Sequence, residues 1–268
     1  MPDAAAKTQT LTDLLDPARA AALHATLDRP GPVPGAGDPL PPFWHQVYFW
    51  RPQRPAALGP DGHPKTGTGL IPNLGLPQRM WAGGRLVFHA PLILGRQARK
   101  ITTVEAVIEK SGRTGRLGFV TLRHEIRQDG ALCVTEHQDL VYRAPPGDRT
   151  DIAPPMARTD ETDALAVQFT TTQLFRYSAL TFNAHRIHYD ADYARGTEGY
   201  AGLVVHGPLL AQLLIHRAQY RLDRIRSFQF RATAALTHLE SAALCWHEDR
   251  TLWVRAADGR QCMTASVA

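Results

Sequence analysis

The sequence predicts an α+β fold built from two antiparallel sheets, each wrapped around a helix. Three observations indicate this fold class. Apolar and polar residues alternate between residues 80 and 143, a Pro-rich and charged stretch covers 144–162, and a helical run from Gly207 precedes further alternating segments. The 268 residues suffice for one large domain or for two of about 130 residues each.

The composition is that of an ordinary globular chain and argues against several functions. Hydrophobic residues make up 44% and charged residues 21%, and no segment offers the roughly 20 apolar residues of a membrane helix. The net charge of +5 comes from scattered bases nearly matched by acids, so we expect no nucleic-acid partner, while a phosphate-bearing small molecule fits. The N-terminal stretch MPDAAAKTQTLTDLL has acids where a signal peptide has bases, and we therefore expect a cytoplasmic protein.

The first half is predicted to begin with a helix and to continue with a long loop. Apolar residues recur at helical spacing over residues 11–27, with Thr10 or Thr12 as a cap, and a Pro-rich run then ends the helix. The aromatic segment 41–50 is typical of a core or of a pocket wall. Residues 51–78 are rich in Pro and Gly and too long for a plain connector, which indicates a functional loop.

Period-two alternation predicts strands in both halves. In the first half we expect strands at Arg85–His89, Ile101–Lys110, Leu117–Gln128 and Leu132–Arg143, with turns at Ser111–Gly115 and Asp129–Gly130. In the second half we expect a helix at Gly207–Tyr220, strands at Ile225–Leu236, Ala242–Glu248, Thr251–Ala257 and Gln261–Val267, and a turn at Asp258–Gly259. Phe88–Leu94 and Phe230–Leu236 share Phe, Ala and Leu at matching positions, a weak echo that fits two similar halves.

One stretch of the second half carries a family resemblance. The segment Phe182–His188, followed by Val205-His206-Gly207, resembles the MaoC-type dehydratases, (R)-specific enoyl-thioester hydratases with a hot-dog fold. In that family a loop reading Asp-x-Asn-Pro-aliphatic-His precedes an aliphatic-His-Gly at the start of the central helix. With Gly59–Pro64 and Arg79–Arg85, the chain is more closely similar to the double-hot-dog branch that contains type 2 hydroxyacyl-thioester dehydratases and mesaconyl-C4-CoA hydratase.

The resemblance implies two fused hot-dog halves and a hydro-lyase activity. It implies a non-catalytic half with the acyl pocket at residues 1–148, a linker at 149–163 and a catalytic half at 164–268. The implied reaction is reversible hydration of an α,β-unsaturated acyl-CoA, short and branched or dicarboxylic like mesaconyl-C4-CoA. The expected partner is this acyl-CoA thioester, and a homodimer stays open.

By the same resemblance, Gly207 supplies the oxyanion contact and His188 is the base. The chain departs from the family pattern at three positions: Asn183 replaces the catalytic Asp, His185 replaces Asn, and Arg186 replaces Pro. An amide cannot accept a proton at neutral pH. We therefore expect His188 to carry the acid–base work, with Asn183 orienting the water.

The remaining site residues have competing interpretations. We expect Arg186, His185, His206 and Val205 to contact the substrate, but Arg186 fits a surface ion pair as well and His206 fits a packed loop histidine. His185, His188 and Asp190 are only a weak metal pattern. The cysteines are three, isolated and without metal-ligand spacing, which favours buried thiols. We expect no metal or redox cofactor, since CoA is part of the substrate.

Two other functions share these features. A hot-dog thioesterase would use the same oxyanion contact but direct water at the carbonyl carbon and release a free thiol. A non-enzymatic subunit would bind acyl-thioesters without changing them. Assays of thiol release and of enoyl absorbance distinguish these alternatives from a hydratase.

Overall fold

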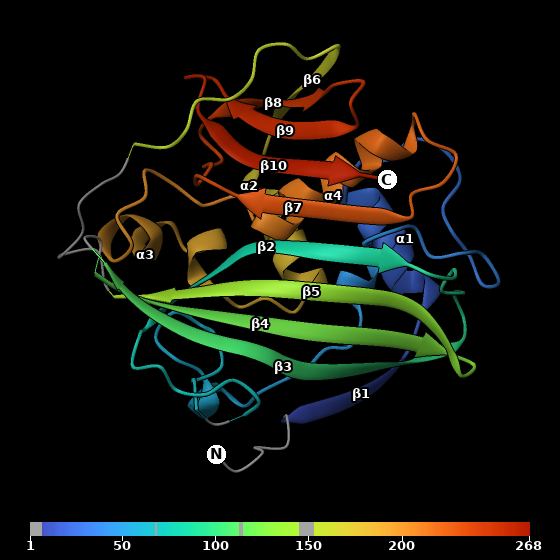
Figure 1. Cartoon of the computed structure of the whole chain (residues 1–268), viewed down its shortest axis with the longest axis horizontal. Helices are drawn as coiled ribbons and strands as arrows, with labels where there is room; N and C mark the ends of the chain where they lie inside the picture. Colours follow the sequence, from blue (N-terminus) through green and yellow to red (C-terminus); the bar gives the residue numbers. More distant parts are fainter. Residues whose placement is uncertain (1–6, 68, 113–114, 145–152) are drawn as a thin grey trace.

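The structure, a computed structural model, describes residues 7–67, 69–112, 115–144 and 153–268 and contains one continuous antiparallel sheet (Figure 1). The first half of the chain contributes β1 (Thr8–Leu14), β2 (Gln78–Phe88), β3 (Gln97–Gly112), β4 (Gly115–Gln128) and β5 (Ala131–Arg143). The second half contributes β6 (Asp163–Gln168), β7 (Ser227–Ala232), β8 (Ser241–Trp246), β9 (Thr251–Ala256) and β10 (Gln261–Val267). The strand order is β1-β3-β4-β5-β2-β7-β10-β9-β8-β6, so each half supplies one side of the sheet.

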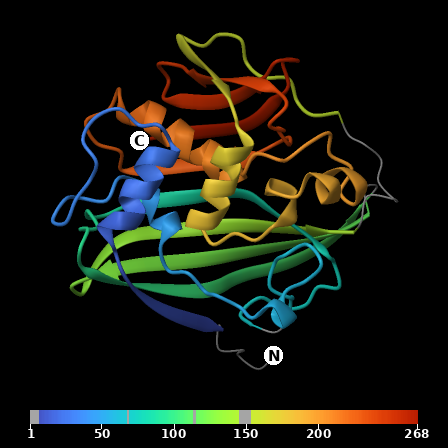
Figure 2. The same cartoon turned by 180° about the vertical axis from the view of Figure 1, so that it is seen from behind.

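The helices come from both halves of the chain. They are α1 (Pro17–Thr26), α2 (Thr171–Leu180), α3 (Ala191–Gly196) and α4 (Gly207–Gln219), with short 3-10 turns η1 (Trp44–Val47), η2 (Pro55–Ala57) and η4 (Arg186–His188). Figure 2 shows α1, α2 and α4 on one face of the sheet. α4 contacts β8, β9 and β10, and α1 packs against α2. Among the described residues, no helix combines the length and apolarity needed to cross a bilayer.

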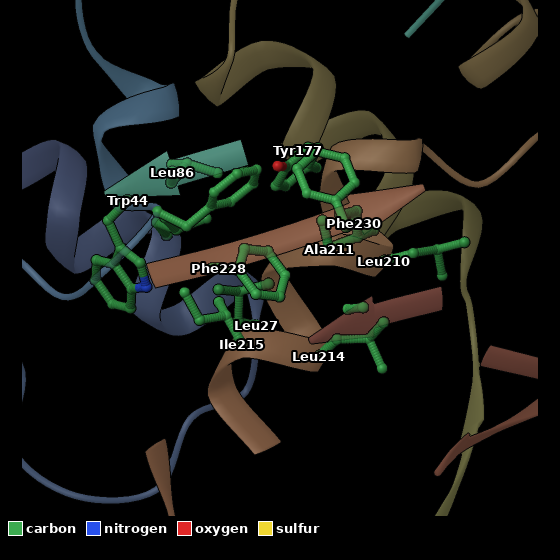
Figure 3. Close-up of a cluster of buried hydrophobic side chains, with 14 of the residues drawn as sticks. Leu27, Trp44, Leu86, Tyr177, Leu210, Ala211, Leu214, Ile215, Phe228 and Phe230 are labelled. Atoms are coloured by element: carbon green, nitrogen blue, oxygen red, sulfur yellow. The ribbon is translucent and has the colours of Figure 1, made fainter. Parts of the chain in front are cut away.

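The main core fills the space between α4 and the sheet. Leu214 and Ile215 of α4 are fully buried and belong to one cluster with Phe228 and Phe230 of β7 and with Leu86 of β2 (Figure 3). Side chains from the two halves therefore share one hydrophobic core, which opposes their separation.

The two halves meet where β2 pairs with β7. Residues 83–87 of β2 face residues 227–231 of β7 in antiparallel register. A β-carbon at Gly83 would lie 2.6 Å from the carbonyl oxygen of Phe230, closer than nonbonded atoms approach, so this seam requires glycine. The register of β2 against β5 shifts between Trp81 and Gly83, which marks a bulge next to the seam.

The prediction of a helix over residues 11–27 is wrong for residues 11–16. Residues 8–14 form β1, which pairs with β3 and exposes alternate side chains. The helix begins only at Pro17, with Asp16 as its cap: the Asp16 carboxylate accepts from the Ala18 N–H at 2.9 Å. Thr10 and Thr12 lie in the strand and cap nothing. Strand pairing with a distant segment outweighs the local helical spacing here.

The other expected elements are confirmed, with shifts at their ends. The four strands of each half and the helix at Gly207 are present. The sequence analysis did not predict β6 and α3, which have six residues each, or α2, which has ten. The expected turn at 111–115 contains residues 113–114, which lie outside the described residues. Cys133, Cys245 and Cys262 are buried thiols, as expected.

The predicted linker is described only in its second part. Residues 145–152 lie outside the described part of the chain. The rest runs along the second half: the Arg158 carbonyl accepts from Trp253 Nε1 at 3.1 Å, and the Thr162 N–H donates to the Trp246 carbonyl at 2.9 Å. This part of the segment is therefore attached to the second half of the sheet.

Truncation of a core side chain on α4 should destabilise the fold. Leu214→Ala removes a fully buried side chain, and we expect the free energy of unfolding to fall by about 2–5 kcal/mol. As a control, Leu239→Ala changes a leucine that is 56% exposed. This variant should shift the free energy of unfolding by less than about 0.5 kcal/mol. Urea unfolding measures both; equal effects would contradict this description of the core.

Candidate active site

A large cavity lies between the two halves. Its volume is about 960 Å³, and both halves line it. The first half contributes Asp61, His63, Arg79, Trp81 and Leu140, among others, and the second contributes Asn183, His185, His188, Val205, Gly207 and Met263, among others. A cavity of this size, lined by both apolar and polar side chains, is large enough for a small-molecule site.

The loop after α2 carries the polar residues of the second half. The helix ends at Leu180, and Phe182 then takes a left-handed backbone conformation (φ 50°) that turns the chain into the cavity wall. The Asn183 side-chain oxygen accepts from the His185 N–H at 3.1 Å, which fixes the turn before η4. η4 then places His188 in the cavity wall.

The hydrogen bond of His188 determines which ring nitrogen can act as a base. Its Nδ1 lies 2.7 Å from the carbonyl oxygen of Val204. A carbonyl can only accept, so Nδ1 carries the proton and Nε2 of the neutral ring has a free lone pair. The side chain is buried, and burial lowers the pKa of His188 to about 4 even though the bond to Val204 favours the protonated ring. At neutral pH His188 is therefore a neutral base.

Four histidine rings lie in a row along this wall. The ring centroids of His63 and His185 are 4.3 Å apart, those of His185 and His188 are 5.4 Å apart, and those of His188 and His206 are 3.7 Å apart. Burial, and after it the neighbouring rings His63 and His188, lowers the pKa of His185. Burial likewise lowers the pKa of His206 well below its usual range. The row is therefore uncharged at neutral pH.

The N-terminus of α4 faces the same cavity. Gly207 is its first residue, its cap residue His206 makes no side-chain hydrogen bond to it, and Pro208 has no N–H. The first N–H groups of a helix have no partner within the helix, and the helix dipole makes this end positive. The Gly207 N–H is thus available to hold an oxygen that gains negative charge.

The structure brings most of the sequence-predicted residues together. Asn183, His185, His188, Val205 and Gly207 line the cavity. The other two residues, His206 and Arg186, lie beside it. His206 is fully buried, with its Nε2 2.8 Å from Ser178 Oγ. Arg186 pairs with Asp190 at 2.7 Å and lies over the Tyr193 ring. Substrate contacts by these residues stay predictions.

The segment Gly59–Pro64 entered the sequence analysis only as part of the family resemblance, and Asp61 and His63 within it were given no role. The Asp61 carboxylate lies 3.1 Å from Nδ1 of His63, and single donor atoms of Asp61, His63 and His185 lie within 4.8 Å of one another. These three residues differ from the weak metal pattern of His185, His188 and Asp190 that the sequence offered. The Asp190 carboxylate instead accepts a hydrogen bond from Arg186. The Asp-x-His spacing within a long Pro/Gly loop was the one signal that pointed to Asp61 and His63.

Comparisons with known proteins identify the family and the fold. The family model for hydroxyacyl-thioester dehydratase type 2 matches residues 43–238. Mesaconyl-C(4)-CoA hydratase of Chloroflexus aurantiacus is 43% identical over 97% of this chain and 95% of its own length. A structure described as a MaoC-like dehydratase is 13% identical, with a TM-score of 0.72 over 98% of this chain and 96% of its own. A Mycobacterium tuberculosis protein described as having a double hot-dog fold is 15% identical, with a TM-score of 0.54 over 97% and 95%.

The fold and the family together define the class of this protein: a double-hot-dog hydro-lyase that acts on thioesters. The two structural likenesses concern the fold, while the family model and the 43% identical relative concern the sequence. The chain belongs to the type 2 hydroxyacyl-thioester dehydratase family, and the resemblance seen in the sequence is confirmed.

The neutral buried histidines should make the fold sensitive to acid. Burial lowers the pKa values of His63 and His188 to about 4, whereas an unfolded histidine titrates near 6.5. The unfolded chain therefore binds protons first, so the stability from these rings is present above pH of about 6.5 and is lost toward pH of about 4. The urea concentration at the unfolding midpoint should decrease as the pH is lowered from 7 to 5. The decrease should be smaller in the His188→Gln variant. A midpoint independent of pH in this range would contradict these protonation states.

Proposed function

We propose that this enzyme catalyses the reversible hydration of an α,β-unsaturated acyl-CoA to the corresponding hydroxyacyl-CoA. One observation carries the proposal: a buried imidazole with a free Nε2 and the N-terminus of a 13-residue helix line the same cavity. Such a pair supplies the base and the oxyanion contact that the addition of water to an unsaturated thioester needs.

The reaction divides between these two groups. The Gly207 N–H binds the thioester oxygen, which becomes enolate-like as water attacks the β-carbon. Nε2 of His188 takes the proton from that water, and a proton then reaches the α-carbon. Loss of one oxyanion donor typically costs on the order of 10²–10³ in rate, and loss of a general base on the order of 10²–10⁴, so both groups are essential to a useful rate.

Asn183 is proposed to orient the attacking water. Its side-chain oxygen already accepts the His185 N–H, which leaves the amide NH₂ group to donate into the cavity. An amide has no basic site at neutral pH, so it can hold the water but cannot take its proton. This fits the replacement of the family's catalytic Asp by Asn at this position.

For the acyl group, we propose a short branched or dicarboxylic chain like that of mesaconyl-C4-CoA. The relative that is 43% identical is named a mesaconyl-C(4)-CoA hydratase. Arg79 lines the cavity and forms no ion pair with any carboxylate in the described residues, so its guanidinium is available to a substrate carboxylate. A homodimer, a cytoplasmic location and a reaction without metal or redox cofactor stay predictions.

Hydration of short enoyl-CoAs tests this function. Purified enzyme should remove the enoyl absorbance of mesaconyl-C4-CoA or crotonyl-CoA without releasing free thiol. His188→Ala should lower kcat by on the order of 10²–10⁴, because it removes the base. His89→Ala changes an exposed histidine that does not line the cavity and serves as the control. Release of free thiol would indicate a thioesterase, and binding without turnover would indicate a non-enzymatic subunit.

A further inference from the structure

The loop Gly59–Pro64 of the first half is fixed against the loop after α2, which carries Ala184 and Arg186 in the second half. The Arg186 N–H donates to the Asp61 carbonyl at 2.9 Å, and Arg186 Nη1 donates to the Pro60 carbonyl at 3.1 Å. A β-carbon at Gly62 would lie 1.9 Å from the carbonyl oxygen of Ala184, so only glycine permits this approach. The loop therefore occupies a defined position in the cavity wall.

This loop presents an aspartate–histidine pair to the cavity. Nδ1 of His63 lies 3.1 Å from one Asp61 carboxylate oxygen, and the His63 backbone N–H donates to the other at 3.0 Å. The ionised carboxylate can only accept, so Nδ1 carries the proton and Nε2 of His63 is free. The two side chains are 14% and 18% exposed, for His63 and Asp61 respectively. The pair thus has the orientation of a carboxylate-supported base.

His185 connects this pair to His188. Its ring contacts the His63 ring on one side, with centroids 4.3 Å apart, and the His188 ring on the other, with centroids 5.4 Å apart. No ring hydrogen bond of His185 occurs among the described residues, so its nitrogens are free to pair with His63 and His188. A proton crosses when ring motion or a bridging water brings an N–H group within hydrogen-bond distance of the next ring nitrogen.

The reaction requires two proton transfers, and Asn183 can perform neither. We propose that the Asp61–His63 pair is a second proton-transfer group, which receives through His185 the proton that His188 takes from water and delivers it to the α-carbon. This inference rests on the proposed hydration. It gives the first half a catalytic part, in contrast to the non-catalytic role expected from the sequence.

The steps balance in atoms and charge. The water oxygen bonds to the β-carbon, its proton passes to Nε2 of His188, and the electron pair of the double bond forms the enolate held at Gly207. The proton moves by way of His185 to Nε2 of His63, and the α-carbon then takes it as the enolate collapses. All three rings return to their neutral forms, and no other reactant is needed.

The Asp61 carboxylate offsets part of the effect of burial and of Arg79 at His63, so His63 and His188 have similar pKa values, near 4, and a proton can pass between them. The partner of His188 is the neutral carbonyl of Val204, whereas the partner of His63 is the charged carboxylate of Asp61. An imidazolium is stabilised more by a carboxylate than by a carbonyl. Hydrogen bonds from the ring and backbone of His63 outweigh the effect of burial and keep the pKa of Asp61 below its usual value, so its charge is present.

Substitution of this pair tests the inference. In His63→Ala we expect kcat for enoyl-CoA hydration to fall on the order of 10²–10³-fold, with KM within about threefold of wild type. Added imidazole should restore part of kcat, which a purely structural role would not allow. In Asp61→Asn we expect a fall of at least about tenfold, because Asn still accepts the His63 N–H but lacks the charge.

A matched control is the His247→Ala variant. His247 also pairs with an aspartate two residues away, with Nδ1 3.0 Å from Asp249, but does not line the cavity, and it should keep wild-type kcat. Thermal unfolding of every variant confirms that it is folded. A folded His63→Ala enzyme with near-normal kcat, a change confined to KM, or no rescue by imidazole would each overturn the inference. Wild-type enzyme inactive on every enoyl-CoA would instead remove the proposed function, and the inference with it.

Discussion

The pairing of β2 with β7 is the constraint on which the rest of this structure depends. It joins two five-stranded halves into one sheet and permits no side chain at Gly83, where the backbone of Phe230 approaches. Because the sheet is continuous, groups far apart in the chain line one cavity, with Asp61 and His63 from the first half beside His185 and His188 from the second. The candidate active site is thus lined by both halves, although the helix α4 belongs to the second alone.

Within that cavity, two similar imidazoles have different hydrogen-bond partners. His188 and His63 have the same ring and both have pKa values near 4, yet one is bonded to a neutral carbonyl and the other to a carboxylate. At His63, burial and the nearby Arg79 offset the Asp61 carboxylate, so the two imidazoles hold an added proton about equally well. Asn183 stands where the family pattern has a catalytic Asp and provides no carboxylate. The cavity still contains one, at Asp61.

The sequence predicted those parts of the fold that local patterns determine. The helix at Gly207 and the strands of both halves are encoded in their own periodicity, and the motif from Asn183 to Gly207 contributes residues that line the cavity. Residues 8–14 were misassigned because pairing with β3 overrides their helical spacing. The Asp61–His63 pair received no role, because its position depends on the docking of a long Pro/Gly loop onto Ala184 and Arg186, a contact that no local pattern reveals.

The central claim is that a thioester spans the cavity from the tip of α4 to the imidazole of His188. A crystal structure of the enzyme with an unreactive acyl-CoA analogue tests it most directly. We predict the thioester oxygen at about 2.7–3.1 Å from the Gly207 nitrogen, with the β-carbon facing Nε2 of His188. A thioester bound elsewhere, or a His188 ring whose Nε2 points away from the acyl chain, would contradict the account.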